Sequence, residues 1–585
     1  MQLSTSAHVD TFCRDNLPAR RDWPELVFDL PELRYPDRLN CATELLDGTV
    51  GRWGPDRPCV LSPTGTWSYG ELLARANQVA GVLVELGVVP GNRVLLRGPN
   101  NPWLAACWLG VLKAGAVAVT TMPLLRGHEL SKIVEASRPT LALTDHRFAA
   151  ELHALGGDLP VLSYGGDAPD DLSVRAAARP ATFDDVPTAA DDVALLAFTS
   201  GTTGAPKATM HFHRDVLAIA DTFSRHVLRP TPDDVFTGSP PLAFTFGLGG
   251  LLVFPLHAGA ATLLVEKAGP VELIETAARH GVTVLFTAPT AYRAILASPS
   301  AHLLRGLRRA VSAGESLSAE LATRFHVATG RWLIDGIGGT EMLHIFISAA
   351  DDEVRPGATG KIVPGYRAAV LDPDGHPVPD GTPGLLAVKG PTGCRYLADD
   401  RQSQAVRNGW TLTGDTFVRD ADGYYWYRAR SDDLIISAGY NIAGPEVEEV
   451  LLGHPDVLDC AVVGTPDPDR GSIVTGAGAR GGRRRAHPAR AAGVRQVLDG
   501  AVQVPPAARV RARAAPQRER QAAALPAAPA GGRATGGHPA GQRSASVTWS
   551  SAGAASFSRS RANRSCARRP FQSAGSSSSG RPGSA

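Results

Sequence analysis

The chain has 585 residues, of which 43% are hydrophobic, and its formal net charge is +2 at pH 7. This length exceeds what one hydrophobic core usually serves, so we expect two or more domains. The near-neutral charge argues against a dedicated nucleic-acid-binding protein. No apolar run reaches membrane-spanning length, and residues 1–10 lack a basic region followed by an apolar one, so we expect no membrane segment and a cytoplasmic location. The seven cysteines are scattered without CxxC pairs, which predicts reduced thiols and argues against structural zinc.

From about residue 43 to residue 474, apolar strand-like runs alternate with helix-like segments. Helical patterns predicted at 71–86, 103–113 and 271–280 are followed by strand-like runs at 93–97, 116–120 and 282–286. Strands separated by helices of this length predict an α/β fold with mostly parallel sheets.

A polar loop follows the next apolar run, residues 193–198. Residues 199–207 read TSGTTGAPK, with four hydroxyl side chains, two glycines and a terminal lysine. Glycines let the backbone approach a ligand closely, and hydroxyls, amides and the lysine can bind a polyphosphate. The loop is not a Walker motif, because GxxxxGK[ST] does not occur. A polar surface turn is the alternative interpretation.

This loop resembles the phosphate-binding signature of the adenylate-forming enzymes, which include acyl- and aryl-CoA ligases, peptide-synthetase adenylation domains and luciferases. The resemblance implies a large adenylation domain with several sheets, followed by a small α+β domain. It also implies that the loop holds the β- and γ-phosphates of ATP, through Thr199, Ser200, Gly201, Thr202, Thr203, Gly204 and Lys207.

Two further segments match this family in the same order. Residues 312–316, SAGES, follow the strand-like run 307–311, and the resemblance places Gly314 and Glu315 against the adenine, although a generic turn is equally consistent. In residues 335–341, DGIGGTE, consecutive glycines permit close approach to a purine. Mg²⁺ needs only one carboxylate beside the substrate phosphates, which suits Glu341, although Glu341 could instead cap a helix. The implied nucleotide residues here are Asp335, Gly339 and Thr340, and the implied catalytic residues are Lys207, Thr340 and Glu341.

The next matching segment contains Thr413-Gly-Asp415 and, fifteen residues after the aspartate, Arg430. A carboxylate can accept both ribose hydroxyls, so Asp415 and Arg430 are expected to bind the sugar, with a hairpin at 422–427 between them. In the family, the aspartate after this arginine is the hinge and a later glycine faces the pantetheine tunnel, which here implies Asp432 and Gly439. The resulting boundaries are 1–431 for the large domain, 432–474 for the start of the small domain, and 475–585 for a tail.

The acid pocket of the family corresponds to residues 243–249 and 342–346. The resemblance makes Phe244 the aromatic gate and gives the acid contacts with Thr245, Phe246, Gly247, His344 and Ile345. Phenylalanine and isoleucine suit a flat apolar ring, whereas Thr245 and His344 could bond an ortho substituent. Ordinary core packing is the alternative. The strings around Phe246 and His344 resemble benzoate-type ligases, and residues 7–12 and 16–18 resemble the 2-aminobenzoate–CoA ligase branch.

The resemblance therefore implies an aryl acid–CoA ligase that uses ATP, Mg²⁺ and coenzyme A, with 2-aminobenzoate or benzoate as the acid. It implies no specific nucleic-acid partner and no membrane partner, and the oligomeric state stays open, with a homodimer among the alternatives. Two other functions stay open: an adenylation module that loads a carrier protein, and a catalytically dead nucleotide-binding protein with a basic tail.

The tail departs from the family. After Lys389 the chain has no lysine, so the second catalytic lysine of the family, near the C-terminus, is missing. Residues 509–525, back-translated with permitted codons and reread one nucleotide later, can give the missing Pro-Arg-x-x-x-Gly-Lys-like segment, so we infer a frameshift near 474–476. Composition predicts disorder from residue 475. The truncated small domain is expected to be unstable and to expose Val447, Val450 and Val462.

Overall fold

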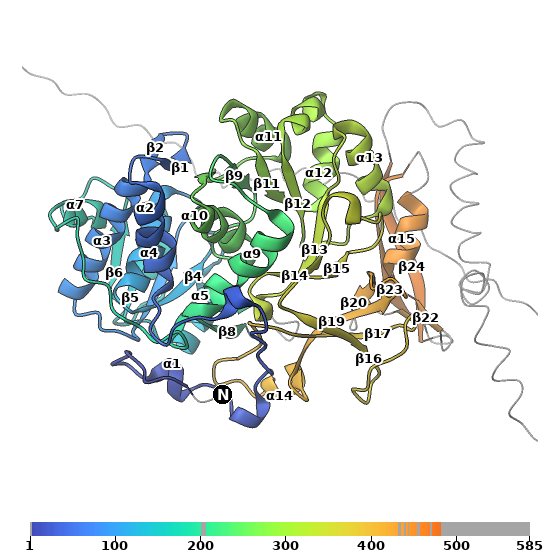
Figure 1. Cartoon of the computed structure of the whole chain (residues 1–585), viewed down its shortest axis with the longest axis horizontal. Coiled ribbons are helices and arrows are strands. Elements are labelled where there is room, and N and C mark those ends of the chain that lie inside the picture. Colours follow the sequence, from blue (N-terminus) through green and yellow to red (C-terminus); the bar gives the residue numbers. More distant parts are fainter. Residues whose placement is uncertain are drawn as a thin grey trace, which may run out of the picture.

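The computed structural model describes residues 3–199, 206–430, 435–437, 440–442, 444–452, 457–467 and 471–480. Two mixed sheets flanked by helices form most of this part, and an antiparallel sheet and two hairpins follow them along the chain (Figure 1). The α/β fold class and the large domain built on several sheets are confirmed.

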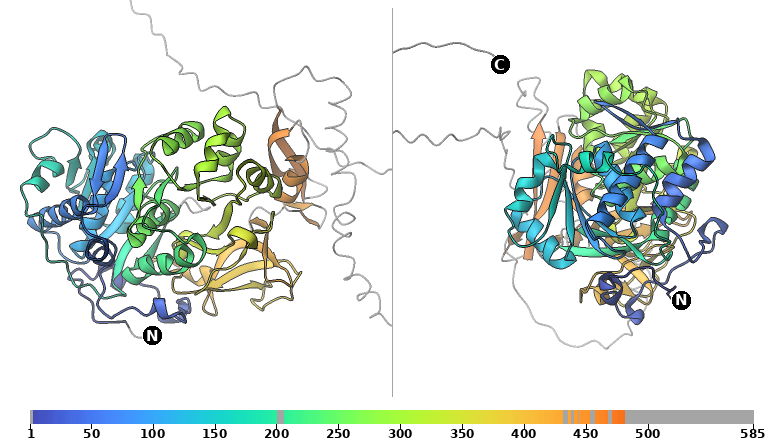
Figure 2. Two further views of the ribbon diagram at one scale, coloured as in Figure 1. Left: turned by 45° about the horizontal axis from the view of Figure 1, so that its top comes forward. Right: turned by 90° about the vertical axis from the view of Figure 1, so that its left-hand side faces the viewer.

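The first sheet has the strand order β6-β5-β3-β4-β7-β8 and is parallel except for β8, which pairs antiparallel with β7. Its strands are β3 (Arg93–Arg97), β4 (Val117–Thr121), β5 (Leu141–Asp145), β6 (Val161–Tyr164), β7 (Val193–Thr199) and β8 (Lys207–Phe212). Alternate residues of β3 and β4 pack into two different cores. Val94 and Ala118 lie in the core that includes helices α3 (Tyr69–Glu85) and α4 (Pro102–Lys113), whereas Leu95 and Val117 lie in the core that includes α5 (Gly127–Ser137) and α6 (Ala149–His153). Helices therefore cover both faces of this sheet, as the side views show (Figure 2).

The second sheet has the order β15-β14-β13-β12-β11-β9-β10-β1-β2. Its central strands are parallel, and β14, β15 and β2 are antiparallel to their neighbours. The strands are β1 (Pro58–Ser62), β2 (Gly65–Ser68), β9 (Val235–Gly238), β10 (Ala261–Leu263), β11 (Val284–Thr287), β12 (Arg309–Ser312), β13 (Ile334–Gly338), β14 (Ile345–Ser348) and β15 (Lys361–Ile362).

The third sheet is antiparallel, so the expected predominance of parallel pairing does not extend to it. Its order is β16-β17-β19-β18, and β20 pairs with β19. Antiparallel neighbours need no helical crossover, and the connections from β18 to β19 and from β19 to β20 are short turns. The strands are β16 (Arg367–Leu371), β17 (Gly384–Lys389), β18 (Val406–Arg407), β19 (Trp410–Arg419) and β20 (Tyr425–Arg430). The predicted hairpin at 422–427 is the turn between β19 and β20.

Local sequence signals explain where the long helices begin. The Ser68 hydroxyl accepts the Glu71 amide at 3.2 Å, and the Glu71 carboxylate accepts the Ser68 amide at 2.8 Å, which together form a capping box for α3. Asn101 caps α4, whose first residue is proline. The other helices are α1 (Phe12–Asp15), α2 (Gly48–Trp53), α7 (Leu172–Ala177), α8 (His213–Ile219), α9 (Thr245–Leu248), α10 (Phe254–Ala258), α11 (Pro270–Arg279), α12 (Pro289–Leu296), α13 (Ala319–Thr329), α14 (Gln402–Ala405) and α15 (Gly444–Leu452).

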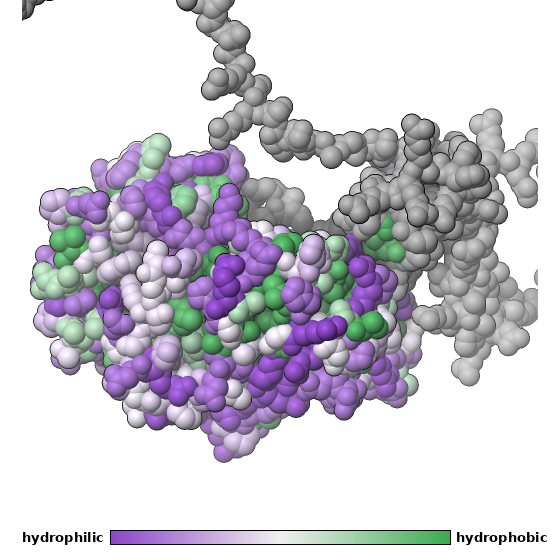
Figure 3. Space-filling view, turned by 90° about the horizontal axis from the view of Figure 1, so that it is seen from above, coloured by the Kyte–Doolittle hydropathy of each residue, from purple (hydrophilic) through white to green (hydrophobic). Residues whose placement is uncertain are grey.

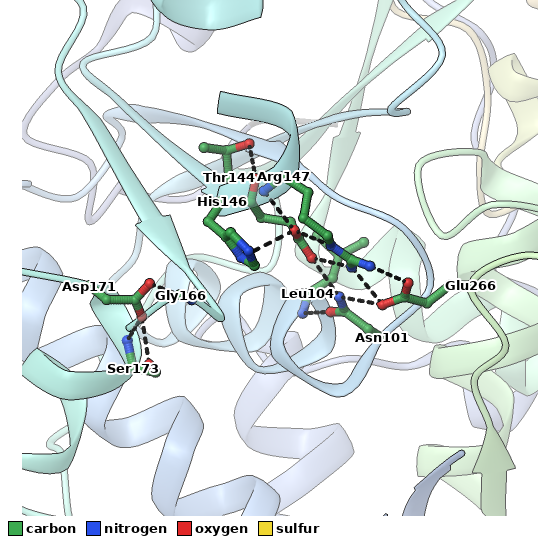
Figure 4. Close-up of polar contacts among 10 residues, drawn as sticks. Asn101, Leu104, Thr144, His146, Arg147, Gly166, Asp171, Ser173 and Glu266 are labelled. Carbon is green, nitrogen blue, oxygen red and sulfur yellow. Dashed lines mark hydrogen bonds and ion pairs between the residues drawn. The ribbon is translucent and has the colours of Figure 1, made fainter. Parts of the chain in front are cut away.

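A polar cluster ties the first two sheets together (Figure 4). Arg147 donates to Asp145, at the end of β5, and to Glu266, which follows β10, with both distances 2.7 Å. Asn101 donates to Asp145 at 3.1 Å and to Glu266 at 3.3 Å. These bonds join the two sheets at this edge, in addition to the hydrophobic core to which both sheets contribute.

Strand structure continues past the predicted start of the tail. Strand β23 (Val457–Asp467) pairs antiparallel with β24 (Gly471–Arg480), so the ordered part of the small domain passes Val474 by six residues. Ile435, Leu451 and Val462 form a small core, with Val447 and Val474 packed against it. The expected exposure of Val447 and Val462 is therefore wrong: Val462 is buried in the cluster with Ile435 and Leu451, and Val447 is partly buried against it. The side chain of Val450 and the tail after residue 480 lie outside the described residues.

The surface has no single dominant character on the face seen from above, where hydrophilic and hydrophobic residues are interspersed (Figure 3). In the part of the chain that the structure describes, no helix combines the length and apolar character that crossing a membrane requires.

Candidate functional site

A cleft of about 750 Å³ lies where the second sheet, the third sheet and α15 meet. It brings together five residues that the sequence assigns to the nucleotide, although they are spread over more than a hundred positions: Gly314, Glu315, Asp335, Asp415 and Arg430. The remaining lining includes apolar and aromatic side chains that sequence reasoning did not identify, namely Pro289, Leu317, Ile337, Phe417, Trp426 and Tyr427. The lining therefore combines apolar and aromatic side chains with many polar ones, and a concave site with convergent polar groups is typical of small-molecule binding.

Asp335 lies on β13 and lines the cleft. Burial raises the pKa of its carboxyl to about 8, and the Gly336 amide only partly offsets this effect. The side chain therefore carries a proton near neutral pH, and a bound group that donates a hydrogen bond to it would favour its ionised form.

Asp415 and Arg430 are directly opposite each other on β19 and β20, and an Arg430 nitrogen lies 3.5 Å from Asp415 Oδ1. The fifteen-residue spacing between them is the length of one hairpin. Because both side chains line the cleft, one ligand can contact the carboxylate and the guanidinium together.

The predicted phosphate loop connects two antiparallel strands. Thr199 ends β7 and Lys207 begins β8, and the two residues are register partners across the hairpin. Ser200, Gly201, Thr202, Thr203 and Gly204 lie outside the described residues, as do Asp432 and Gly439.

Tyr396 connects Lys207 with Glu341. Its hydroxyl donates to Glu341 Oε1 at 2.6 Å, and Lys207 Nζ lies 3.5 Å from the same hydroxyl. Burial raises the pKa of Tyr396, so its phenol remains a donor at neutral pH. Thr340, the neighbour of Glu341, has its carbonyl oxygen 2.8 Å from His211 Nε2.

The carboxylate of Glu341 fits a magnesium ion that is bound largely through substrate phosphates. Glu341 is partly exposed, and only one of its oxygens, Oε1, takes part in the bond with Tyr396. No group of three or more His, Cys, Asp or Glu side chains suited to a metal ion occurs among the described residues. Mg²⁺ is commonly held by one or two carboxylates plus phosphates, which matches this donor set.

The expected acid pocket contains a histidine enclosed by aromatic rings. His344 is 3% exposed, and its ring centroid lies 4.6 Å from that of Phe254, 5.3 Å from Phe223 and 5.7 Å from Phe246. Burial lowers the pKa of His344 to about 3, although the main chain of Phe246 favours the protonated form, so the imidazole is neutral. The main chain of Phe246 lies near enough to act on the ring, but neither ring nitrogen has a partner that meets hydrogen-bonding distance and angle. Unpaired buried polar atoms are unusual and call for a ligand or a water molecule.

The other expected pocket residues divide between surface and interior. Phe244 is 44% exposed, and Thr245, Phe246 and Gly247 form most of α9 directly after it. Ile345 is buried and begins β14.

The glycines of residues 335–341 permit close packing of the backbone as well as access of a ligand. An added Cβ at Gly336 would lie 2.7 Å from the Ile345 side chain, and one at Gly338 would lie 2.7 Å from the His344 carbonyl oxygen. Gly339 has no comparable steric conflict. Two of the glycines in residues 335–341 are therefore required because β13 and β14 approach each other closely, a reason that sequence reasoning did not identify.

Comparisons with known proteins show the family of this chain. Residues 47–396 match the family model for AMP-binding enzymes, and residues 446–523 match the model for the C-terminal domain of these enzymes. The benzoate–CoA ligase of Thauera aromatica is 34% identical over 453 residues, which cover 75% of this chain and 85% of that enzyme.

Solved structures give the same result. The anthranilate CoA ligase AuaEII in complex with anthranoyl-AMP is 31% identical, with a TM-score of 0.76 over 81% of this chain and 92% of that one. A benzoate CoA ligase from Burkholderia xenovorans LB400 is 30% identical, with a TM-score of 0.72 over 79% of this chain and 93% of that one. The chain belongs to the AMP-binding enzyme family. Within this family it is an adenylate-forming acid–CoA ligase by similarity.

The match to the C-terminal domain model extends past Val474, the position near which a frameshift is inferred. The frameshift and the domain boundaries stay predictions.

Proposed function

We propose that this chain activates an aromatic carboxylic acid with ATP and transfers the aryl group to coenzyme A. The observation that carries the proposal is the position of His344 and of the aromatic side chains packed around it. His344 follows Thr340 and Glu341 by a few residues, so an aromatic acid that contacts it would lie next to the proposed phosphate end of the site. Relatives that are named for benzoate and for anthranilate support an aromatic acid.

The reaction consists of two displacements. A carboxylate oxygen of the acid attacks the α-phosphorus of ATP, and pyrophosphate leaves with the electrons of the broken P–O bond. The thiol of coenzyme A, with loss of its proton, then attacks the acyl carbon, and AMP leaves. The first step is needed because a carboxylate has no good leaving group, whereas AMP is one.

In this scheme, residues of the cleft bind the nucleoside, and Lys207 and Glu341, which do not line the cleft, act on the phosphates. Asp335 accepts a hydrogen bond from the base, and Asp415 and Arg430 bind the ribose. Lys207 and the loop after Thr199 bind the β- and γ-phosphates. A magnesium ion held by Glu341 would neutralise charge that develops on the phosphate oxygens, the type of stabilisation that contributes most to phosphoryl transfer.

The neutral imidazole of His344 favours an acid with a hydrogen-bonding ortho substituent. One of its nitrogens is a donor and the other an acceptor, and neither has a protein partner in hydrogen-bonding geometry. A 2-amino group would pair with the acceptor nitrogen, whereas benzoate would leave both nitrogens without a substrate partner. We therefore propose 2-aminobenzoate first and benzoate second.

The test is a product analysis with a panel of benzoate, 2-aminobenzoate, 2-hydroxybenzoate and an aliphatic acid. Purified chain is incubated with each acid, ATP and Mg²⁺, with and without coenzyme A, and mass spectrometry measures acyl-AMP and acyl-CoA. The proposal expects aryl-AMP without coenzyme A and aryl-CoA with it. Preference for the aliphatic acid would exclude the aromatic pocket, and aryl-AMP that never proceeds to aryl-CoA would favour carrier-protein loading.

We further propose that the chain as written adenylates slowly, because the lysine expected near the C-terminus is absent. Loss of one charge-stabilising donor typically costs about 10²–10³ in rate. ATP binding should persist, since the proposed nucleotide contacts in the cleft come from residues before position 431.

A further inference from the structure

Tyr396 is held rigidly beside the strand that carries Lys207. Residues 394–397 lie along β8, where the Met210 amide donates to the Arg395 carbonyl at 2.8 Å and the Leu397 amide donates to the Ala208 carbonyl at 2.9 Å. The Tyr396 amide donates to the buried side chain of Gln402, also at 2.8 Å. The tyrosine is therefore fixed on both sides of its own backbone, and its ring is 2% exposed.

The hydroxyl of this tyrosine lies between a cation and an anion. It is 2.6 Å from Glu341 Oε1 and 3.5 Å from Lys207 Nζ, and the ammonium lies 5.1 Å from the centre of the phenol ring. Within the described residues, Lys207 has no ion-pair partner within 4.0 Å. The phenol thus occupies the position where the two charged groups would otherwise approach each other.

Arg395, the residue before Tyr396, lies on another side of the turn that carries Thr340 and Glu341. Arg395 forms a fully buried ion pair with Asp215, and Asp215 Oδ2 lies 3.7 Å from His211 Nδ1. His211 in turn contacts the Thr340 carbonyl oxygen at 2.8 Å. Tyr396 therefore contacts Glu341 directly, whereas Arg395 is linked to Thr340 only through the longer approach of Asp215 to His211.

We propose that Tyr396 is a positioning residue that orients the Glu341 carboxylate and keeps it from pairing with the Lys207 ammonium. A direct ion pair would satisfy both charges internally, and a triphosphate with its metal ion would then have to break it. With the phenol between them, the carboxylate stays directed toward a metal ion and the ammonium stays available to a phosphate. This inference rests on the proposed function, because it concerns the ends of ATP that Lys207 and Glu341 are proposed to hold.

The test compares nucleotide binding by Tyr396→Phe with that of the wild-type chain, by calorimetry on the full 585 residues. The phenylalanine keeps the ring, so the fold should be retained, and thermal unfolding checks this. Tyr35→Phe is the matched control, because Tyr35 also donates a phenol hydrogen bond to a carboxylate, that of Asp221 at 2.8 Å, and neither residue is assigned to the nucleotide or the acid.

We expect Tyr396→Phe to weaken MgATP binding about 10-fold or more, the effect of losing one hydrogen bond to a charged group. Binding of AMP without Mg²⁺ should stay within about 2-fold, since AMP lacks the β- and γ-phosphates and the metal ion; this ratio corresponds to 0.4 kcal/mol. Tyr35→Phe should leave both affinities unchanged. In a Lys207→Met background, the further loss on Tyr396→Phe should be smaller than in the wild-type chain, because the ion pair that the phenol prevents can no longer form.

Equal losses for MgATP and AMP would show a general structural role and overturn the inference, as would unchanged MgATP binding. If Tyr396→Phe fails to fold, Lys207→Met becomes the test of the inference. Lys207→Met must then weaken binding of MgATP more than binding of AMP, and equal or absent losses would contradict the inference. A wild-type chain that binds neither nucleotide would overturn the proposed function itself, and this inference with it.

Discussion

Replacement of Gly249 by alanine tests whether His344 forms a rigid wall of the acid pocket. A Cβ at this position would lie 2.3 Å from His344 Cδ2, 2.8 Å from its Nε2 and 3.2 Å from Phe254 Cζ. The backbone is helical there, with φ −62°, so alanine has no conformational penalty and the collision is the whole perturbation. The imidazole would have to retreat by about 1 Å to restore ordinary contact.

The aromatic neighbours leave little room for that retreat. His344 is 3% exposed and lies within 6 Å, centre to centre, of the rings of Phe223, Phe246 and Phe254. Forcing an extra methyl group into a packed interior typically costs about 1–3 kcal/mol. We therefore expect Gly249→Ala to lower the unfolding free energy by that amount and to weaken binding of the aromatic acid about 10-fold, equivalent to 1.4 kcal/mol.

Calorimetry of ATP and acid binding, together with thermal unfolding, measures these effects. ATP binding should not change, because Gly249 does not line the cleft. Gly51→Ala in helix α2 is the matched control: nothing lies within 4 Å of its added Cβ, so helix propensity alone should stabilise this variant by about 0.5–1 kcal/mol. Unchanged stability and acid affinity in Gly249→Ala would refute the rigid wall.

Three further predictions concern the nucleotide cleft. Burial raises the pKa of Asp335 to about 8, so between pH about 4 and 8 the folded chain holds a proton that the unfolded chain has released. The contribution of Asp335 to the free energy of unfolding therefore falls as pH rises over this range, by at most about 1.4 kcal/mol per pH unit. The unfolding temperature of Asp335→Asn should fall less over this range, and parallel profiles would contradict this expectation. Asp415→Ala and Arg430→Ala should each weaken ATP binding about 10-fold in a titration. The double variant should lose less affinity than the product of the two single losses, because the two side chains contact the same proposed ligand. Strictly additive losses of binding free energy would oppose a shared ribose site. Glu341→Gln should slow adenylation about 10²-fold and raise the Mg²⁺ concentration needed for half-maximal rate, and an unchanged Mg²⁺ dependence would argue against a role in metal binding.

Much of the fold follows from local patterns in the sequence. The apolar runs at 93–97 and 193–198 and the helical pattern at 103–113 correspond to β3, β7 and α4 within two residues at each end. These segments are long and strongly patterned, and their caps and flanking polar residues mark the ends. The pairing of β23 with β24 as far as Arg480 was not predicted, since no local signal marks how far a strand will be extended by its partner.

The sequence alone predicts residues of the candidate site only where they belong to a contiguous motif. Asp335, Asp415 and Arg430 belong to short strings, and the cleft brings them together. Tyr396 and His211 belong to no such string, and they reach Glu341 and Thr340 only because residues 394–397 pair with β8. Contacts of this kind depend on tertiary pairing between segments nearly 190 residues apart, which composition and spacing do not encode.

The most direct test of the central claim is ATP–pyrophosphate exchange with 2-aminobenzoate and benzoate, measured on the chain as written and on a version with the reading frame restored after Val474. We expect strong acid-dependent exchange by the restored chain and much weaker exchange by the chain as written. Equal exchange by both would show that another residue replaces the missing lysine, and the explanation of the tail would be wrong. Exchange by neither would contradict the assignment to aromatic acids.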